Sequence, residues 1–267
     1  MSVPPQFVNI SWRNQSLSIE HQWINVERTN CPLIIFLHEG LGSLSMWKDY
    51  PKELCDALNV RGLVYSRPGY GRSWAYERGT AWSVDFMHRQ AFEVLPALLD
   101  ALNIKDKPWL FGHSDGGSIA LLHATKFPVS GLIVMAPHIM VENISISSIQ
   151  SARDAFVNTN LRERLSRYHI DVDSVFWGWN QIWLDPQFRS WSIEEEISII
   201  KCPVLAVQGV EDEYGTMAQI KGISQRIEQT QLAELAQCGH SPHRDQPQLL
   251  TQICLEFFNS NQNPLLT

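Results

Sequence analysis

A six-residue run at positions 112–117, GHSDGG, has the residue types and spacing of a turn that presents a nucleophilic serine. An apolar stretch at 108–111 precedes this run, and a segment with helical spacing at 118–125 follows it. Ser114 is therefore expected on a strand-to-helix turn, where small residues two positions to either side let the backbone lift the hydroxyl out of the sheet. A G-x-S-x-G run also occurs by chance in glycine-rich loops, but the flanking strand and helix favour nucleophilic catalysis.

A serine nucleophile needs a base, because a free hydroxyl is hardly ionised at neutral pH and an imidazole must take its proton. Of the nine histidines, His240 directly follows the last expected strand, on a loop that should emerge at the same sheet edge as Ser114. His240 is therefore the candidate base. The alternatives are His243, which could be a residue at a helix start, and His113, which is expected to pack structurally beside the turn.

The base needs an acid that holds it in the correct tautomer, and this acid should come from another strand end. Asp212 fits best, because it lies shortly after the expected strand at 204–207. Its neighbours Glu211 and Glu213 are chemically able, but a loop with three acids is expected to leave two in water. Glu142, soon after an earlier strand, is the alternative acid.

An acyl-transfer intermediate also needs hydrogen-bond donors for its oxyanion, and the loop at 38–43, HEGLGS, follows the expected strand at 33–37. The expected donors are the backbone amides of Gly40 and Asp115. The Asp115 carboxylate, in the first turn of the next helix, is expected to interact favourably with the helix dipole. This chemistry requires neither a metal nor a cofactor.

The elements that must position these residues alternate between short apolar strands and helices, which predicts a buried parallel sheet in an α/β fold. The expected strands lie at 16–24, 33–37, 62–65, 109–111, 131–135, 204–207 and 231–235. The expected helices lie at 47–58, 84–102, 118–125, 217–227 and 249–258.

The alternation stops after residue 136 and resumes at residue 201. We expect residues 1–136 and 201–267 to form one core domain, and residues 137–200 to form a helical lid inserted into it. The lid is rich in tryptophan, and Trp177, Trp179 and Trp183 are candidates to line a substrate pocket, together with Leu41 from the oxyanion loop. Tryptophans on helices also form lid cores, so the two interpretations stay open.

Composition limits the possible partners. The 267 residues suit one large domain, and a formal charge of −7 without a Lys/Arg cluster argues against nucleic acid and anionic membranes. No apolar run approaches the roughly 20 residues of a membrane span, and the first ten residues do not resemble a signal peptide. The five cysteines are scattered and never spaced as C-x-x-C, so neither a disulfide framework nor a zinc site is expected. We expect a cytoplasmic protein with a small-molecule substrate; the oligomeric state, a homo-oligomer included, stays open.

The chain resembles the α/β-hydrolase superfamily from about residue 15 to about residue 258, because its segments stand in the order that this superfamily uses. These segments are the oxyanion loop, the SRPGYGRS segment at 66–73, Ser114, Asp212 and His240. The resemblance implies an eight-stranded, mostly parallel sheet flanked by helices, with the lid after its sixth strand. It also implies hydrolysis of esters or related bonds without a cofactor.

Two features of these segments qualify the resemblance. Members commonly read His-Gly-x at the oxyanion loop, but Glu39 takes the glycine position here, which leaves open whether Gly40 or Leu41 donates. The segment at 66–73 is expected to be structural, with Arg67 or Arg72 fixed inside.

The sequence therefore predicts a serine hydrolase that cleaves a carboxylic ester of a small, apolar or aromatic substrate through an acyl-enzyme. A carbon–carbon bond hydrolase of ring-cleavage products is an alternative, although that family tends to place tryptophan after the catalytic histidine and Ser241 stands here. Dehalogenases and epoxide hydrolases of this fold use an aspartate nucleophile, which Ser114 excludes. A ligand-sensing receptor with slow turnover is the alternative from another class.

Overall fold

The computed structural model describes residues 4–74 and 82–262 of the chain. Residues 1–3 and 263–267, which the sequence assigns to the core domain, lie outside the described part, as do residues 75–81.

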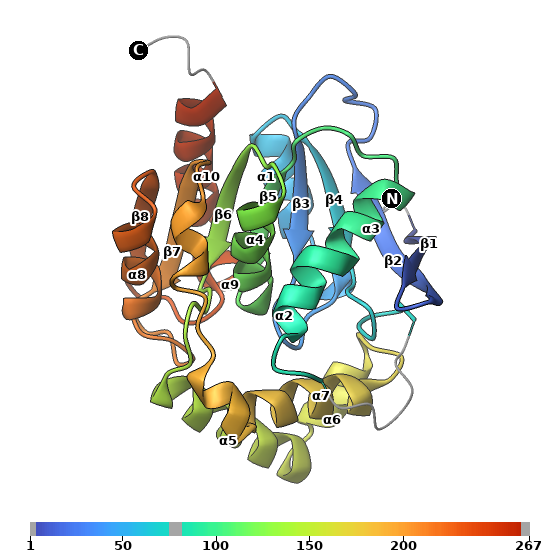
Figure 1. Ribbon diagram of the computed structural model, residues 1–267, viewed down its shortest axis with the longest axis vertical. Helices are drawn as coiled ribbons and strands as arrows, with labels where there is room; N and C mark the ends of the chain where they lie inside the picture. The colour runs from blue at the N-terminus through green and yellow to red at the C-terminus, as the bar shows by residue number, and fades with distance from the viewer. Residues whose placement is uncertain (1–3, 75–81, 263–267) are drawn as a thin grey trace.

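An eight-stranded sheet forms the centre of the molecule, in the order β1-β2-β4-β3-β5-β6-β7-β8 (Figure 1). The pairs β1–β2 and β2–β4 are antiparallel, and every other pair is parallel, so the predicted mostly parallel sheet is confirmed. The strands are β1 (Gln6–Trp12), β2 (Gln15–Ile24), β3 (Leu33–Leu37), β4 (Arg61–Tyr65), β5 (Trp109–His113), β6 (Gly131–Met135), β7 (Val204–Gly209) and β8 (Thr230–Leu235).

Helices cover both faces of this sheet, because the inner strands are apolar on both sides. In β3, Ile35 and Leu37 belong to the hydrophobic core shared with α3 and α4, whereas Ile34 and Phe36 belong to the core shared with α1 and α10. The helices of the core are α1 (Tyr50–Ala57), α2 (Phe86–Arg89), α3 (Leu95–Ala101), α4 (Asp115–Lys126), α8 (Ala218–Arg226), α9 (Pro242–Asp245) and α10 (Pro247–Gln262).

The helix expected at 84–102 is divided in the structure. A π-helical turn, η2 (Gln90–Val94), separates α2 from α3. Pro96 in the first turn of α3 has no N–H for the regular α-helical bond pattern, and the wider π turn accommodates it.

Three helices lie between β6 and β7 in the chain and gather beyond one end of the sheet (Figure 1). An antiparallel bridge between Met140 and Ser192 joins the two segments that lead into and out of this insertion. The stacked rings of Phe156 and Phe176, with centroids 3.7 Å apart, help to form its interior. The helices of the insertion are α5 (Asn143–Asn158), α6 (Leu161–Ser166) and α7 (Val172–Leu184), followed by the 3-10 turns η3 (Pro186–Ser190) and η4 (Glu196–Ile199). A further 3-10 turn, η1 (Leu44–Trp47), lies between β3 and α1.

Within the described residues, the helices are all too short or too polar to cross a bilayer.

Candidate active site

Ser114 occupies a strained turn between β5 and α4. Its backbone has φ 53° and ψ −121°, a left-handed conformation that typically costs a non-glycine residue about 1–3 kcal/mol. The two flanking glycines make this turn possible: a Cβ on Gly112 would lie 2.3 Å from the carbonyl oxygen of Gly116, and one on Gly116 would lie 2.1 Å from the carbonyl oxygen of Leu37. The turn therefore packs directly against β3 and holds the hydroxyl at the carboxyl edge of the sheet.

The structure brings the three predicted side chains together. Ser114 Oγ lies 2.9 Å from His240 Nε2, and His240 Nδ1 lies 2.9 Å and 3.1 Å from the two carboxylate oxygens of Asp212. With Nδ1 donating to Asp212, Nε2 is free to accept the serine proton, which is the arrangement of a nucleophile, a general base and an orienting acid.

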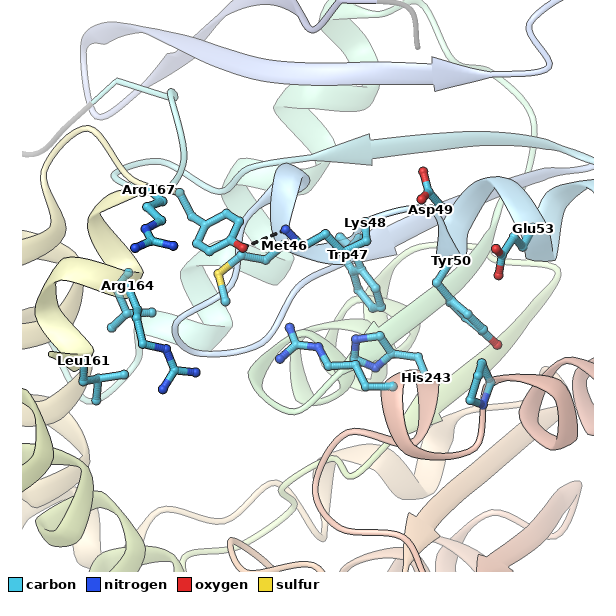
Figure 2. Close-up of a pocket in the computed structure, with 14 residues that line it drawn as sticks. Met46, Trp47, Lys48, Asp49, Tyr50, Glu53, Leu161, Arg164, Arg167 and His243 are labelled. Carbon is cyan, nitrogen blue, oxygen red and sulfur yellow. Dashed lines mark hydrogen bonds between the residues drawn. The ribbon is translucent and has the colours of Figure 1, made fainter. Parts of the chain in front are cut away.

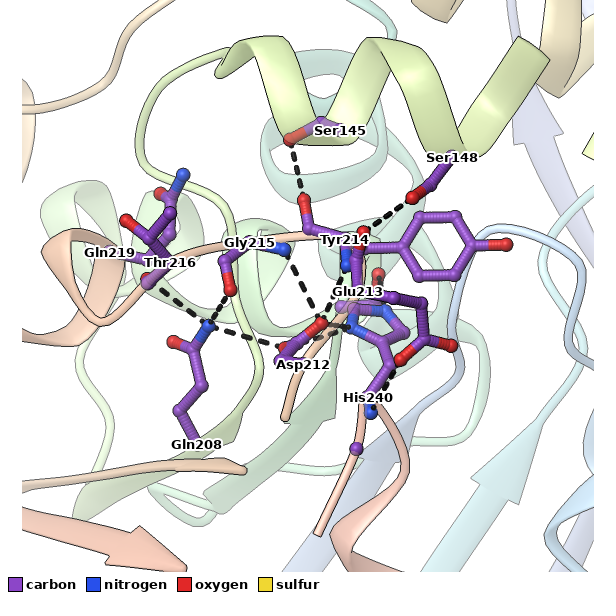
Figure 3. Close-up of polar contacts among 12 residues, drawn as sticks. Ser145, Ser148, Gln208, Asp212, Glu213, Tyr214, Gly215, Thr216, Gln219 and His240 are labelled. Atoms are coloured by element: carbon purple, nitrogen blue, oxygen red, sulfur yellow. Dashed lines mark hydrogen bonds and ion pairs between the residues drawn. The ribbon is translucent and has the colours of Figure 1, made fainter. Parts of the chain in front are cut away.

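Asp212 is held as an anion at the end of β7 (Figure 3). The amides of Tyr214 and Gly215 donate to its Oδ1 at 2.8 Å and 3.3 Å, and Gln208 Nε2 donates to its Oδ2 at 3.2 Å. Burial raises the pKa of Asp212, but the hydrogen bond and charge of His240 and the Tyr214 amide together bring that pKa below its ordinary value of 3.8. Sequence reasoning gave no role to Gln208, whose Nε2 also donates to the Gly215 carbonyl at 2.7 Å.

Carboxylates also fix the loop that carries His240. Glu213 accepts from the His240 amide at 3.3 Å, Glu211 accepts from the Cys238 amide at 2.7 Å, and Asp245 accepts from the Gly239 amide at 2.9 Å. Glu211 and Glu213 are exposed to solvent, as expected, and each also accepts a hydrogen bond from the histidine loop.

The alternative residues have other positions. Glu142 accepts hydrogen bonds from Thr216 and Gln219, and no hydrogen bond joins it to His240. His113 donates from Nε2 to the His240 carbonyl at 2.7 Å and supports the loop from behind, as the structural interpretation expects. His243 lies at the start of α9, buried against Trp47, with ring centroids 5.0 Å apart.

The oxyanion loop is anchored through the carbonyl of Glu39. Arg67 Nη2 donates to this oxygen at 2.8 Å, His38 Nδ1 at 2.8 Å, and the Gly42 amide at 3.0 Å. Because a trans peptide points its N–H away from its carbonyl, the Gly40 amide faces away from this cluster. This orientation favours Gly40 over Leu41 as the first donor. The Asp115 amide opens α4, where the first N–H groups of a helix have no partner within it.

Arg67 and Asp115 form a buried pair beneath this loop. Arg67 is fully buried, and its Nη2 lies 3.9 Å from Asp115 Oδ2. Burial raises the pKa of Asp115 to about 6 against the opposing charge of Arg67, so interaction with the helix dipole alone does not describe this carboxylate. Of the two alternatives for the arginine fixed inside the 66–73 segment, the structure has Arg67 buried and Arg72 exposed. Arg67 thus contacts residues on both sides of the candidate oxyanion site, which sequence reasoning did not foresee.

A cavity of about 100 Å³ lies over Ser114. Gly40 lies directly against a tryptophan of α7, because a Cβ on this glycine would lie 2.2 Å from Trp179 Nε1. Trp177 is not among the lining residues: its ring packs instead on Phe156 and Phe176, so its candidacy for the pocket is wrong. The cavity is lined by Glu39, Gly40, Leu41, Ser114, Asp115, His138, Ile149, Trp179, Trp183, Tyr214 and His240.

His138 is a cavity residue that sequence reasoning missed. Its ring lies 4.8 Å from that of Trp183 and 5.9 Å from that of His240, measured between centroids. Burial lowers the pKa of His138 to about 3, so this imidazole is neutral near pH 7. Its position three residues after β6, at the carboxyl edge of the sheet, is the signal that could have identified it.

Helix α5 of the insertion between β6 and β7 is bonded to the acid loop (Figure 3). Ser145 Oγ on α5 donates to the Tyr214 carbonyl at 2.6 Å, and Ser148 Oγ donates to the Glu213 carbonyl. Helix α5 and the loop of Asp212 are therefore one connected unit.

As for metals, the described residues hold no cluster of three or more His, Cys, Asp or Glu side chains suited to an ion.

Comparisons with known proteins agree with this architecture. A model of the alpha/beta hydrolase family matches residues 34–253. A proline iminopeptidase of Thermoplasma volcanium is 23% identical over 291 residues, covering 92% of this chain and 95% of that protein. A thermophilic esterase from Thermogutta terrifontis superposes with a TM-score of 0.73 at 18% identity, covering 97% of this chain and 99% of that one. A structure from a study of carboxylesterases of Nitrososphaera gargenis gives a TM-score of 0.75 at 17% identity, with coverage of 96% and 99%.

Proposed function

The chain belongs to the alpha/beta hydrolase family, and from that premise we propose that it is a serine hydrolase that cleaves a carboxylic ester, or a related acyl bond, of a small molecule. The observation that carries this proposal is the continuous hydrogen-bond chain from Ser114 through His240 to Asp212.

The proposed mechanism is acyl transfer. Ser114 attacks the carbonyl carbon while His240 accepts its proton, and the amides of Gly40 and Asp115 stabilise the oxyanion. His240 then gives the proton to the leaving group. A water molecule activated by the same imidazole releases the acyl group from Ser114.

The size of the cavity supports a small acyl group. Pockets for drug-sized ligands usually measure roughly 300–1,000 Å³, whereas the cavity over Ser114 has about 100 Å³. Residues 137–200 act in this proposal as a lid, with Trp179 and Trp183 as the aromatic wall. Five free cysteines are consistent with a reducing, cytoplasmic setting.

Labelling with a fluorophosphonate tests the nucleophile. The wild-type protein should be labelled and should hydrolyse p-nitrophenyl esters, and Ser114→Ala should lose both properties, with turnover falling on the order of 10⁶-fold if the triad acts as a unit. Ser130→Ala, which removes an exposed hydroxyl bonded to the Lys107 carbonyl, is the matched control and should behave as wild type. Retention of most turnover in Ser114→Ala on every ester cleaved would refute the proposal.

An amide bond next to an N-terminal residue is the second candidate substrate, favoured by similarity to proline iminopeptidase over 92% of this chain. Parallel assays with prolyl p-nitroanilide and p-nitrophenyl acetate distinguish the two, since an iminopeptidase should prefer the anilide. Negligible turnover of both, together with ligand-induced stabilisation, would instead favour a ligand-sensing role.

A further inference from the structure

A second, larger hollow lies beside the candidate active site. This groove, which we call the seam groove, has a volume of about 540 Å³ and separates lid helix α6 from the core around η1 and α9 (Figure 2). Its cationic residues are Lys48, Arg164, Arg167 and Arg244.

The charge of the seam groove is opposite to that of the chain. The whole protein carries a formal charge of −7, yet four cations line the groove against two carboxylates, Asp49 and Glu53. Figure 2 shows both carboxylates on the side of α1, away from Arg164 and Arg167 on the lid. The sequence shows no basic cluster because these cations come from three separate segments, which the fold brings to one groove.

The lid arginines are available to a ligand. Arg164 has no carboxylate partner within the described ranges 4–74 and 82–262, and Arg167 has only an exposed contact of 3.5 Å with Glu163. On the opposite wall, Lys48 Nζ donates to Tyr168 Oη at 2.7 Å. Surface pairs of this kind contribute little stability, so these cations can turn to an anion at low cost.

The floor of the groove contains buried polar atoms that lack a partner. Trp47 Nε1 and both ring nitrogens of His243 are buried without a hydrogen-bond partner among the described residues, and both side chains line the groove. An indole N–H can only donate, and a neutral imidazole always has one N–H. Two of these three nitrogens are therefore donors, which suit the oxygen atoms of an anion, and the third is an acceptor.

The seam groove and the catalytic cavity share a wall. Arg244, which lines the groove, lies 3.3 Å from Glu39 through its Nη2 and Oε1 atoms, and Glu39 lines the cavity over Ser114. Arg244 is also only four residues beyond His240. The two hollows are therefore neighbours divided by this ion pair, and a substrate that occupies both has to pass it.

We propose that the seam groove binds an anionic group, a carboxylate or a phosphate, carried by the substrate that is cleaved at Ser114. This inference rests on the proposed function, because it assigns the part of the substrate that the small cavity cannot hold. Arginine suits the role, since its planar guanidinium meets both oxygens of such a group at once. Met46 and Leu161 in the lining supply apolar surface for the chain that connects the anion to the ester.

Paired esters test the proposal on the full-length protein. We would compare p-nitrophenyl hemiesters of dicarboxylic acids of increasing length with the corresponding methyl-capped neutral diesters, and measure kcat/KM for each pair. The wild-type protein should prefer the charged ester at one or more lengths, and added salt should reduce this preference. In the double variant Arg164→Gln/Arg167→Gln the preference should fall about tenfold or more, while the neutral esters keep their rates.

Arg162→Gln is the matched control, because Arg162 lies on the same helix but pairs with Asp173 at 2.6 Å and does not line the groove. It should keep the wild-type preference. Calorimetric titration of Ser114→Ala with inorganic phosphate provides a readout independent of catalysis, and adding Arg164→Gln/Arg167→Gln should weaken that binding.

The outcomes separate the two proposals. A charged-to-neutral ratio that is the same in the wild type and the double variant overturns the groove assignment. Phosphate binding with an unchanged ratio would mean that the groove serves a separate anion, which also overturns the link to the substrate. If no ester is cleaved at all, the proposed function fails. Phosphate binding then decides whether the groove is an anion site, because the arginine variant should lose this binding.

Discussion

Gln208 and Arg67 take no part in the proposed chemistry, but they hold the candidate catalytic residues in position. Gln208 donates to both the Asp212 carboxylate and the Gly215 carbonyl, so it fixes the acid loop to the end of β7. Arg67 holds the Glu39 carbonyl and thereby the orientation of the Gly40 amide. The reactive side chains depend on these two for their geometry.

Asp212→Asn should reduce kcat on the order of 10⁴-fold, because an amide no longer holds His240 in the tautomer that accepts the serine proton. Glu142→Gln, which changes the alternative acid, should alter kcat less than about tenfold, since the structure joins Glu142 to Thr216 and Gln219 instead. Steady-state kinetics of both variants on one ester measures the two changes in kcat. The reverse order of effects would assign the role to Glu142.

Asp115→Asn should stabilise the protein in a pH-dependent way. The folded-state pKa of Asp115, about 6, lies above its ordinary value of 3.8, so ionisation costs folding free energy as the pH rises through this interval. The variant should therefore gain on the order of 2–3 kcal/mol above pH 6 and almost nothing near pH 4. Urea unfolding at both pH values measures this, and an equal difference at the two would contradict it.

The sequence predicted that Ser114, Asp212 and His240 meet at one edge of the sheet because each lies within five residues of the end of a strand. It was insufficient where the partners come from distant segments, as for Arg67, which lies 28 positions from Glu39. The tryptophans are an intermediate case. Trp179 and Trp183 lie one turn apart on α7 and share a face, whereas Trp177 points elsewhere, and this follows from the helical period once the helix is known.

Among the elements, the strand-to-helix turn at Ser114 has strict steric requirements at both of its flanking glycines, Gly112 and Gly116. Its two neighbouring elements, β3 and α4, approach so closely that only glycine fits at position 116. The same crowding holds the beginning of the oxyanion loop against the nucleophile turn.

Gly116→Ala should destabilise the protein by about 1–3 kcal/mol and lower any rate measured on p-nitrophenyl esters, because the added Cβ would lie 2.1 Å from the Leu37 carbonyl oxygen and displace the loop after β3. Gly117→Ala is the neighbouring control. Its Cβ would first meet the Pro137 side chain at 3.0 Å, and the helix gains propensity, so its stability should change by less than about 1 kcal/mol. Thermal unfolding of both variants checks the difference; equal loss in the two would show that crowding at position 116 is not limiting.

Elements that are buried on both faces were predictable, and those at the edge were less so. Strand β3 is a continuous apolar run and was predicted with its observed limits. Strand β1 was missed, because only Ile10 and Trp12 of its seven residues are buried and its remaining residues are polar or exposed. The π turn before Pro96 was missed because apolar spacing alone does not show where a proline interrupts the helical hydrogen bonds.

For the whole molecule, the two hydrophobic cores on either side of the sheet enclose most of the thiols. Cys55 and Cys254 lie in the core beneath α1 and α10, and Cys238 is buried beside the histidine loop. The rate at which a reagent modifies these three thiols is therefore a measure of global unfolding.

A thiol reagent should modify at most Cys31 and Cys202 quickly in the native protein, and all five cysteines after unfolding. Burial raises the pKa of Cys55 and of Cys238 to about 12, so their reactive thiolates are rare as well as inaccessible. Time-resolved reaction with a chromogenic disulfide measures the two phases. Rapid modification of more than two thiols would contradict the enclosed cores.

The serine hydrogen bonds from α5 to the acid loop determine how the covering helices can move. Because Ser145 and Ser148 tie α5 to the carbonyls next to Asp212, lifting that side would pull the acid away from the histidine. The chain just after α6 is fastened to the core as well, because His169 Nε2 donates to the Leu41 carbonyl and the Ile170 amide donates to the Gly71 carbonyl, each at 3.0 Å. The covering helices are therefore held at both ends, and lifting either end would break hydrogen bonds to the core.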